Sequence, residues 1–235
     1  MKIDVVGSMC TWTKKLSTSY IINDEILFDT PQGTFKTLFE DYDILKTNYI
    51  IISHFHSDHF MDIHLVMDYL YHHTKKKITI IAPKGCRERL SSMFKIVDIT
   101  YLENSFNDMF SIIEIENNKI IKIGDYKIKA FKMLHLNLDS YGFTITHNGV
   151  TVGFSGDSAM CNNVRKIISK SKTAFIDCAS LEVNNKHLTS DEVYGLIKEF
   201  PECKIYPIHM STFSQPRLDE LGIEYPNQAD VINVV

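Results

Sequence analysis

Ser53-His54-Phe55-His56-Ser57-Asp58-His59 is the stretch that decides the fold, because it places four metal-ligating side chains within six positions. It follows an apolar run, and Tyr49–Ser53 is predicted to be a strand. If the extended backbone continues, the side chains of His54 and His56 leave it on the same side and can surround one cation. Asp58 and His59 can then face a second cation. Imidazoles with a carboxylate suit zinc, manganese or iron, and two such ions can share a bridging hydroxide. The alternative, a solvated polar loop, fits such a dense cluster poorly.

The composition excludes several classes of protein. The chain has 235 residues, 44% hydrophobic and 23% charged, and we expect one folded domain over residues 1–235. The net charge of −4 gives no global attraction to nucleic acid or to an anionic membrane. We expect no membrane span and no secretion signal, and the five scattered cysteines form no C-x-x-C pair. These features favour a cytoplasmic protein.

Short strands alternate with helical segments over the rest of the chain. A helix is predicted from His59 to Tyr71, and another follows the capping pattern Thr189-Ser190-Asp191-Glu192. The strands meander first and alternate with helices later, which suggests two sheets between helical layers. The predicted strands are Lys2–Val6, Ser19–Ile22, Glu25–Phe28, Tyr49–Ser53, Ser111–Glu116, Ile120–Ile123, Tyr126–Met133, Tyr141–His147, Val150–Phe154, Ala174–Cys178 and Lys204–Pro207.

The histidine cluster resembles the H-x-H-x-D-H motif of the metallo-β-lactamase superfamily, and the resemblance extends from Lys2 to about Ser211. It implies an α/β fold, a four-layer αββα sandwich of two mixed β-sheets flanked by helices. It also implies two divalent ions, zinc first and manganese or iron as alternatives. By this resemblance one metal is held by His54, His56 and His135, the other by Asp58, His59 and His209, and Asp157 bridges them.

A further histidine points to one branch of that superfamily. His187-Leu188-Thr189, together with His209-Met210-Ser211, resembles the ribonuclease Z branch, in which a histidine assists phosphodiester cleavage. The resemblance implies that His187 and Asp58 are catalytic and manage proton transfer, although Asp58 can serve as a ligand only. The alternative for His187 is an exposed histidine ahead of a helix.

Two departures from ribonuclease Z limit the substrate. Only 21 residues lie between His135 and Asp157, and two predicted strands fill them, so no long tRNA-gripping arm fits there. Where that branch carries a glutamate to orient the assisting histidine, this chain has Cys178 with Asp177 beside it. We therefore expect a small phosphodiester, a cyclic nucleotide or a short nucleic acid as substrate.

Several alternatives stay open at this point. The same metal site can hydrolyse a thioester, a lactone or a β-lactam, and a diiron redox protein is a weaker alternative because it needs a flavin domain. A homodimer is compatible with the sequence, and Ser214–Val235 is open between a lid and a dimer contact. The histidines expected outside the site are His64, His72, His73 and His147.

Overall fold

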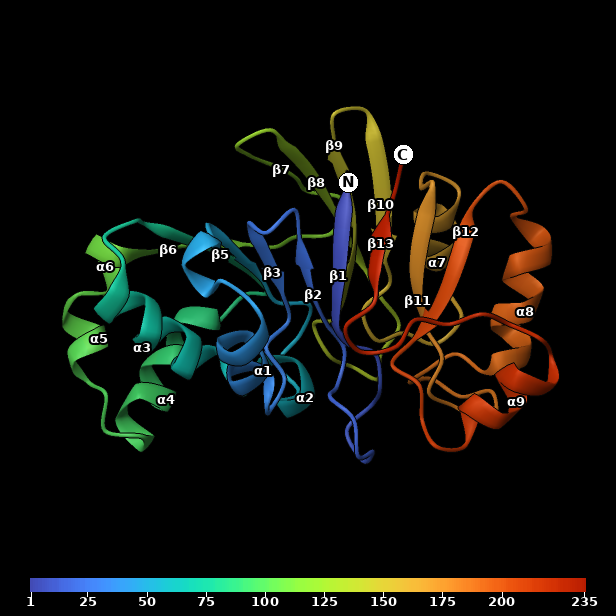
Figure 1. Cartoon of the computed structure of the whole chain (residues 1–235), viewed down its shortest axis with the longest axis horizontal. Coiled ribbons are helices and arrows are strands. Elements are labelled where there is room, and N and C mark those ends of the chain that lie inside the picture. The colour runs from blue at the N-terminus through green and yellow to red at the C-terminus, as the bar shows by residue number, and fades with distance from the viewer.

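The computed structural model describes residues 1–235 and contains two β-sheets with helices on their outer sides (Figure 1). The strands are β1 (Lys2–Gly7), β2 (Ser19–Ile22), β3 (Ile26–Phe28), β4 (Tyr49–Ile51), β5 (Ile78–Ala82), β6 (Phe110–Glu114), β7 (Ile120–Ile123), β8 (Tyr126–Lys132), β9 (Tyr141–His147), β10 (Val150–Phe154), β11 (Thr173–Asp177), β12 (Lys204–Ile208) and β13 (Val231–Asn233). The helices are α1 (Thr34–Asp41), the 3₁₀ helix η1 (Ile44–Lys46), α2 (Ser57–Phe60), α3 (Ile63–His73), α4 (Cys86–Ile96), α5 (Tyr101–Asn104), α6 (Phe106–Met109), α7 (Asn162–Ile168), α8 (Ser190–Glu199) and α9 (Ser214–Glu220).

Both sheets are mixed. The first has the order β13-β1-β2-β3-β4-β5-β6, antiparallel as far as β3 and parallel from β3 to β6. The second has the order β12-β11-β10-β9-β8-β7, parallel among β10 to β12 and antiparallel from there to β7. Parallel strands need helical crossovers, which place helices on the outer face of each sheet.

Strand alternation divides the buried residues among three hydrophobic cores. In β3, Ile26 and Phe28 pack between the two sheets, whereas Leu27 packs toward the helices on the outer side. A third core lies between the second sheet and its helices, where Phe131 and Ile176 pack with Leu196 of α8. Three cores separate four layers, which confirms the predicted αββα sandwich.

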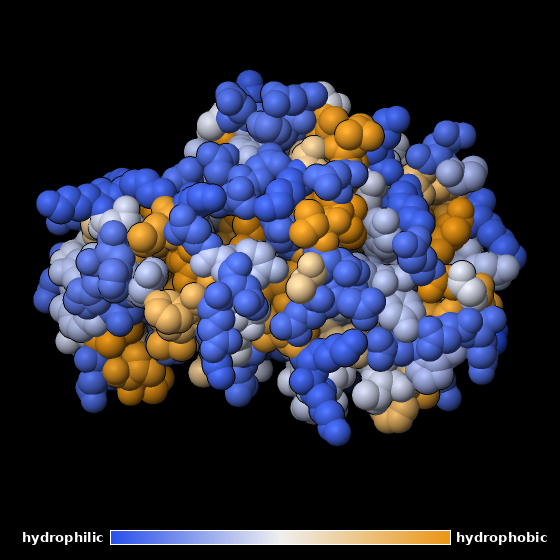
Figure 2. All heavy atoms as spheres, in the orientation of Figure 1, coloured by the Kyte–Doolittle hydropathy of each residue, from blue (hydrophilic) through white to orange (hydrophobic).

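The two chain ends and the short helix α2 lie at opposite edges of the sandwich (Figure 1). On the face in Figure 2 hydrophilic residues predominate and the hydrophobic ones form scattered groups. Both termini lie at the upper edge in Figure 1, whereas α2 and the β1–β2 loop lie at the lower edge. No helix combines the length and the apolar character that a bilayer crossing needs.

Two local expectations need correction. The sequence suggested that an extended strand continues through His54 and His56. Strand β4 instead ends at Ile51, and these two histidines lie in irregular backbone. The helix predicted from His59 is broken between α2 and α3, because the backbone N–H of Asp62 donates to the carbonyl of Thr30 at 2.9 Å. The segment Ser214–Val235, whose role the sequence left open, forms α9 and the edge strand β13, which pairs with β1.

Candidate metal centre

The predicted ligands meet where strands of both sheets end. The irregular segment after β4 and the short helix α2 carry His54, His56, Asp58 and His59. From the second sheet, His135 follows β8, Asp157 follows β10 and His209 directly follows β12. The first sheet therefore supplies one half of the site and the second sheet the other half.

The side chains form three overlapping groups, and in each group the candidate ligand atoms all lie within 4.8 Å of one another. Asp157 belongs to two of these groups, and its carboxylate lies 3.1 Å from His59 Nε2 of the group to which it does not belong. The groups are His54, His56, His135 and Asp157; Asp58, His59 and His209; and Asp157, His187 and His209. This arrangement matches the division that the sequence resemblance implied, and the ligand roles themselves stay predictions.

Unpaired buried atoms show that the residues fit cations. The Nε2 atoms of His54 and His59 and the Oδ1 atom of Asp157 are buried and make no well-aligned hydrogen bond, although His59 Nε2 and Asp157 Oδ1 lie 3.1 Å apart. Leaving such a group unpaired costs about 1–3 kcal/mol each, and several together are hard to sustain in a folded protein. Divalent cations bound in the two groups would satisfy all three atoms. Imidazole and carboxylate donors are those that zinc, manganese and iron prefer.

Hydrogen bonds from residues around the site orient the imidazoles of His59 and His135 and the carboxylate of Asp58. Asp29 is 1% exposed, and its carboxylate accepts hydrogen bonds from the Ser53 backbone N–H, the Ser53 hydroxyl and His59 Nδ1, each at 2.7 Å. His135 Nδ1 donates to the carbonyl of Lys186 at 2.8 Å, and Thr11 donates to Asp58. Because Nδ1 of His59 and Nδ1 of His135 are occupied by these bonds, Nε2 is the nitrogen that each imidazole would offer to a cation.

Charges around the site set the protonation of its members. Burial holds the pKa of His54 well below its ordinary value, which keeps this imidazole neutral. Burial also acts to lower the pKa of His59, but the carboxylates of Asp157 and Asp29 outweigh it and hold the pKa well above its ordinary value. Burial acts to raise the pKa of Asp157, yet the surrounding imidazoles, His209 first, hold it well below its ordinary value. Asp157 is therefore an anion at neutral pH.

The backbone is left-handed at several points of the site. Gly156 has φ +57°, and a Cβ atom on it would lie 2.8 Å from the carbonyl oxygen of Tyr141, so only glycine fits directly before Asp157. Asp29 and His209 have φ +54° and +55° without being glycine. Such a conformation is uncommon in non-glycine residues and gathers at functional sites.

His187 lies at the rim of the cluster and is held by Asp177. Its Nδ1 donates to Asp177 Oδ2 at 2.8 Å, and Asp157 Oδ2 is 4.0 Å away. Burial acts to lower the pKa of His187, but Asp177 outweighs it and raises the pKa to about 9. Of the two residues that the sequence left open for orienting this histidine, Asp177 does so; Cys178 is buried beside Ser190 instead.

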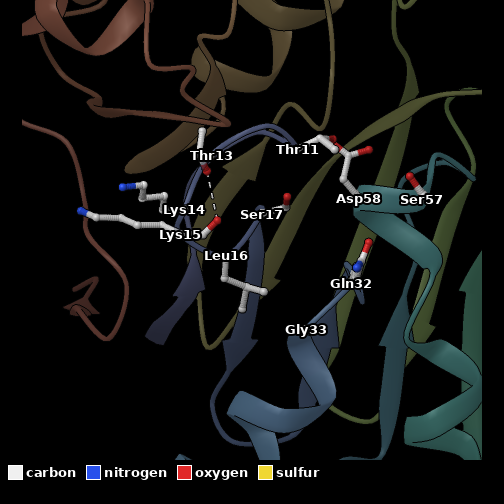
Figure 3. Close-up of a pocket in the computed structure, with 10 residues that line it drawn as sticks. All are labelled: Thr11, Thr13, Lys14, Lys15, Leu16, Ser17, Gln32, Gly33, Ser57 and Asp58. Carbon is white, nitrogen blue, oxygen red and sulfur yellow. Dashed lines mark hydrogen bonds between the residues drawn. The ribbon is translucent and has the colours of Figure 1, made fainter.

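Two hollows meet at Thr11 and Asp58. A cavity of about 420 Å³ contains His56, His135, Asp157, His187 and His209 in its lining. A second hollow of about 320 Å³ lies on the other side of Thr11 and is lined mainly by polar residues (Figure 3). In Figure 3 the ammonium groups of Lys14 and Lys15 point away from Asp58. The first cavity is therefore the one that opens onto both halves of the candidate centre.

The other histidines lie outside the centre, as the sequence predicted. His64 bonds the carbonyl of Met61 just before α3, and His73 bonds the carbonyl of Tyr69 within α3. His72 pairs with Asp68, and His147 stacks on Tyr126. The residues that sequence reasoning missed are Thr11, Lys186 and above all Asp29. The turn from Phe28 into Asp29 resembled the superfamily pattern, but no role was assigned to this carboxylate.

Comparison with known proteins places the chain in a family. Residues 1–222 match the family described as anti-Pycsar protein Apyc1. The chain belongs to the Apyc1 family. This member is also similar to ribonuclease Z of Methanosarcina mazei, with 26% identity over 196 residues, 80% of this chain and 61% of the relative. Ribonuclease Z of Thermoplasma volcanium is 25% identical over 175 residues, 74% of this chain and 54% of the relative. The chain thus spans little more than half the length of these curated relatives.

Solved structures with the same architecture establish the fold of this Apyc1-family chain. The metallo-β-lactamase fold protein YhfI from Bacillus subtilis aligns with a TM-score of 0.80 and 17% identity over 98% of both chains. The short form of human tRNase Z aligns with a TM-score of 0.78 and 16% identity over all of both chains. A diphosphatase of the PhnP family gives 0.79 and 14%, over 100% of this chain and 98% of the other. The predicted metallo-β-lactamase fold is confirmed.

Proposed function

We propose that this chain is a dinuclear metal-dependent hydrolase that cleaves a phosphodiester. The observation that carries the proposal is the His187–Asp177 pair beside the two ligand groups, because a protonated imidazole suits a phosphodiester, whose leaving oxygen needs a proton. The similarity to ribonuclease Z and to a PhnP-family diphosphatase supports phosphorus as the site of attack.

The ligand set stays as predicted from the sequence. His54, His56 and His135 would hold one ion, Asp58, His59 and His209 the other, and Asp157 would bridge them. Zinc is the first choice, with manganese or iron as alternatives. Bound ions of this kind activate water as a nucleophile and neutralise charge that develops on a phosphoryl group.

The chain's own residues manage protons and orientation. Asp177 holds Nδ1 of His187, which leaves the other ring nitrogen to donate a proton to the leaving oxygen or to stabilise charge on the phosphoryl group. Thr11 holds Asp58 by a hydrogen bond. The bond occupies one lone pair of the Asp58 carboxylate and fixes its orientation. The other lone pairs remain available to a metal ion or a proton.

The substrate that we propose is small. A cavity of about 420 Å³ lies within the range of small-molecule sites. Strands β9 and β10 fill the chain between His135 and Asp157, so this part supplies no extended arm for a folded RNA. A cyclic nucleotide or a short oligonucleotide fits both observations.

Turnover of competing substrates tests the proposal. The protein is loaded with zinc or manganese and offered bis(p-nitrophenyl) phosphate, 3′,5′-cyclic nucleotides, a thioester, a lactone and a chromogenic β-lactam side by side. We expect the phosphodiesters to be cleaved fastest. Preferred cleavage of a carbon ester or β-lactam would assign the same site to acyl substrates, and oxygen consumption by an iron-loaded form with an electron donor would assign it to redox chemistry.

Variants separate the site from the rest of the fold. His187→Ala is expected to abolish most of the phosphodiesterase activity while the bound metal, measured by elemental analysis, stays unchanged. His64→Ala is the matched control, because His64 is a partly exposed residue of α3 that bonds the carbonyl of Met61 outside the centre. Equal loss in both variants would contradict the role of His187.

A further inference from the structure

Trp12 is the only tryptophan of the chain, and 92% of its surface is exposed. Tryptophan has the largest aromatic surface of any residue, and removing that surface from water lowers the free energy. An indole that is almost fully exposed does not gain this stabilisation within the chain. Trp12 lies in the loop between β1 and β2 and lines the cavity over the candidate centre. Its position at a cavity rim distinguishes it from an aromatic residue exposed elsewhere on the surface.

The loop that carries Trp12 is fixed on both sides. At its base, a Cβ atom on Gly7 would lie 2.1 Å from the carbonyl oxygen of Ser17, so the returning strand packs directly on this glycine. The backbone N–H of Cys10 donates to the carbonyl of Met210 at 2.9 Å. The indole is therefore presented from an anchored loop.

The hydroxyls on either side of Trp12 strengthen this anchoring. Thr11 donates to Asp58. The Thr13 hydroxyl donates to the carbonyl of Lys15 at 3.0 Å (Figure 3), and the carbonyl of Cys10 is 3.2 Å from the same oxygen. Thr11 thus connects the Trp12 loop to a candidate metal ligand. The backbone that carries Trp12 therefore loses little conformational freedom when a ligand covers the ring.

The walls of the cavity have a different chemistry from its floor. The floor is made of imidazoles and carboxylates, whereas the walls include Trp12, Phe213 and Leu136, of which 92%, 67% and 37% are exposed. Phe213 follows the segment that is bonded to the Trp12 loop, because Met210 N–H donates to the carbonyl of Ser8 at 3.2 Å. Two exposed aromatic rings thus come from neighbouring loops above a floor that would hold a phosphoryl group.

The hollow on the other side of Thr11 offers no such surface. Its lining contains one hydrophobic residue, Leu16, among threonines, serines and lysines. An apolar part of a substrate held at the centre would therefore lie on the Trp12 side.

We infer that Trp12 is the stacking surface for the base of a nucleotide held at the candidate centre. This inference rests on the proposed function only in that it places the phosphate at the candidate centre. A flat heterocycle joined through a sugar to a phosphate matches aromatic walls above a phosphate-binding floor. Stacking accepts every base because each has a π-face, so Trp12 contributes affinity and does not select one base.

Intrinsic fluorescence gives a direct reading, because Trp12 is the chain's only tryptophan. The probes are adenosine and uridine 5′-monophosphate, with ribose 5-phosphate as the ligand that lacks a base. Each is titrated into the metal-loaded protein and into protein treated with a chelator. We expect both nucleotides to quench the emission and to bind more tightly than ribose 5-phosphate. Nucleotides that bind no more tightly than ribose 5-phosphate would overturn the inference.

Variants test whether the ring itself provides the affinity, with calorimetry replacing fluorescence. Trp12→Ala is expected to weaken binding of adenosine 5′-monophosphate by about 5- to 140-fold, the range that stacking of one base gives. Trp12→Phe keeps a π-face and should retain most of the affinity, and Trp12→Leu should not. Phe39→Ala removes an aromatic residue that is 60% exposed on α1 and should leave binding unchanged. Wild-type affinity in Trp12→Ala would overturn the inference.

Failure of the inference and failure of the proposed function give different results. A protein that cleaves bis(p-nitrophenyl) phosphate but binds adenosine 5′-monophosphate no better than ribose 5-phosphate keeps its function and loses the role of Trp12. A protein that cleaves no phosphodiester but still binds the nucleotide through Trp12 keeps the nucleotide site and loses the proposed reaction.

Discussion

Replacing Asp29 by asparagine should separate metal binding from folding. Asp29 Oδ1 accepts from the Ser53 backbone N–H, and Oδ2 accepts from the Ser53 hydroxyl and from His59 Nδ1. In Asp29→Asn the amide oxygen can keep the bond to the Ser53 N–H, which puts the NH₂ group beside His59. That NH₂ group donates to Nδ1, so in the neutral imidazole, the form that binds a cation, the one proton lies on Nε2. Nε2 is the atom that His59 would offer to a cation, and a protonated nitrogen cannot bind one.

The size of the effect follows from the three contacts of 2.7 Å. Loss of a partner that orients a metal-binding histidine typically costs about 10- to 100-fold in metal affinity. Asp29→Ala removes all three acceptor contacts and leaves buried donors unpaired, which should lower the free energy of unfolding by about 3–5 kcal/mol. Asp29→Asn keeps part of the network and should lose less.

The assay is a competition between the protein and a fluorescent chelator for zinc, combined with chemical unfolding of the metal-free protein. Asp62→Asn is the matched control, because Asp62 is also buried and accepts a backbone hydrogen bond, from Phe35 at 3.0 Å, away from the centre. Wild-type zinc affinity in Asp29→Asn would refute the reasoning. So would an equal loss of zinc affinity in Asp62→Asn.

The remaining predictions concern the reaction, the loop and the core. His187→Ala should lower kcat by about 10²- to 10⁴-fold in steady-state assays. Asp177→Asn removes the charge that raises the pKa of His187 to about 9, so the proton-donating form is lost at lower pH and the alkaline limb of the kcat profile should move toward neutrality. Gly7→Ala should lower Tm by several degrees relative to wild type, because its Cβ would lie 2.1 Å from the Ser17 carbonyl oxygen. Phe28→Ala opens the core between the sheets and should cost about 3–5 kcal/mol in denaturant unfolding, and a cost below 1 kcal/mol would contradict that packing.

The cluster from His54 to His59 could be recognised from sequence because its members are neighbours along the chain. Asp29 could not, because its partner His59 is 30 residues away. The two meet since β3 and β4 pair in parallel with Phe28 opposite Ile51, which brings the residues after both strands together. Sequence periodicity predicts strands but does not specify which strands become neighbours.

Sequence alone also could not specify which residue orients His187, or where strand β4 ends ahead of the His54–His59 cluster. Asp177 ends β11, and His187 comes ten residues later, ahead of α8, so which neighbour orients it depends on the loop between them. The end of β4 was predicted too late, since an apolar run continues to Ile52 and gives no stop signal. The capping pattern at Thr189 was predicted correctly because its bonds are local, Thr189 with Glu192.

The division of the centre between two sheets bears on the order of folding. Neither sheet carries a complete set of donor atoms, so high-affinity coordination can exist only after the sheets have docked across the core around Phe28. Ion uptake is then a late event in folding, and release of the ions must precede or accompany separation of the sheets. Bound ions would stabilise the folded state in which the two sheets are docked. The cell's supply of metal would then affect the protein's lifetime as well as its activity.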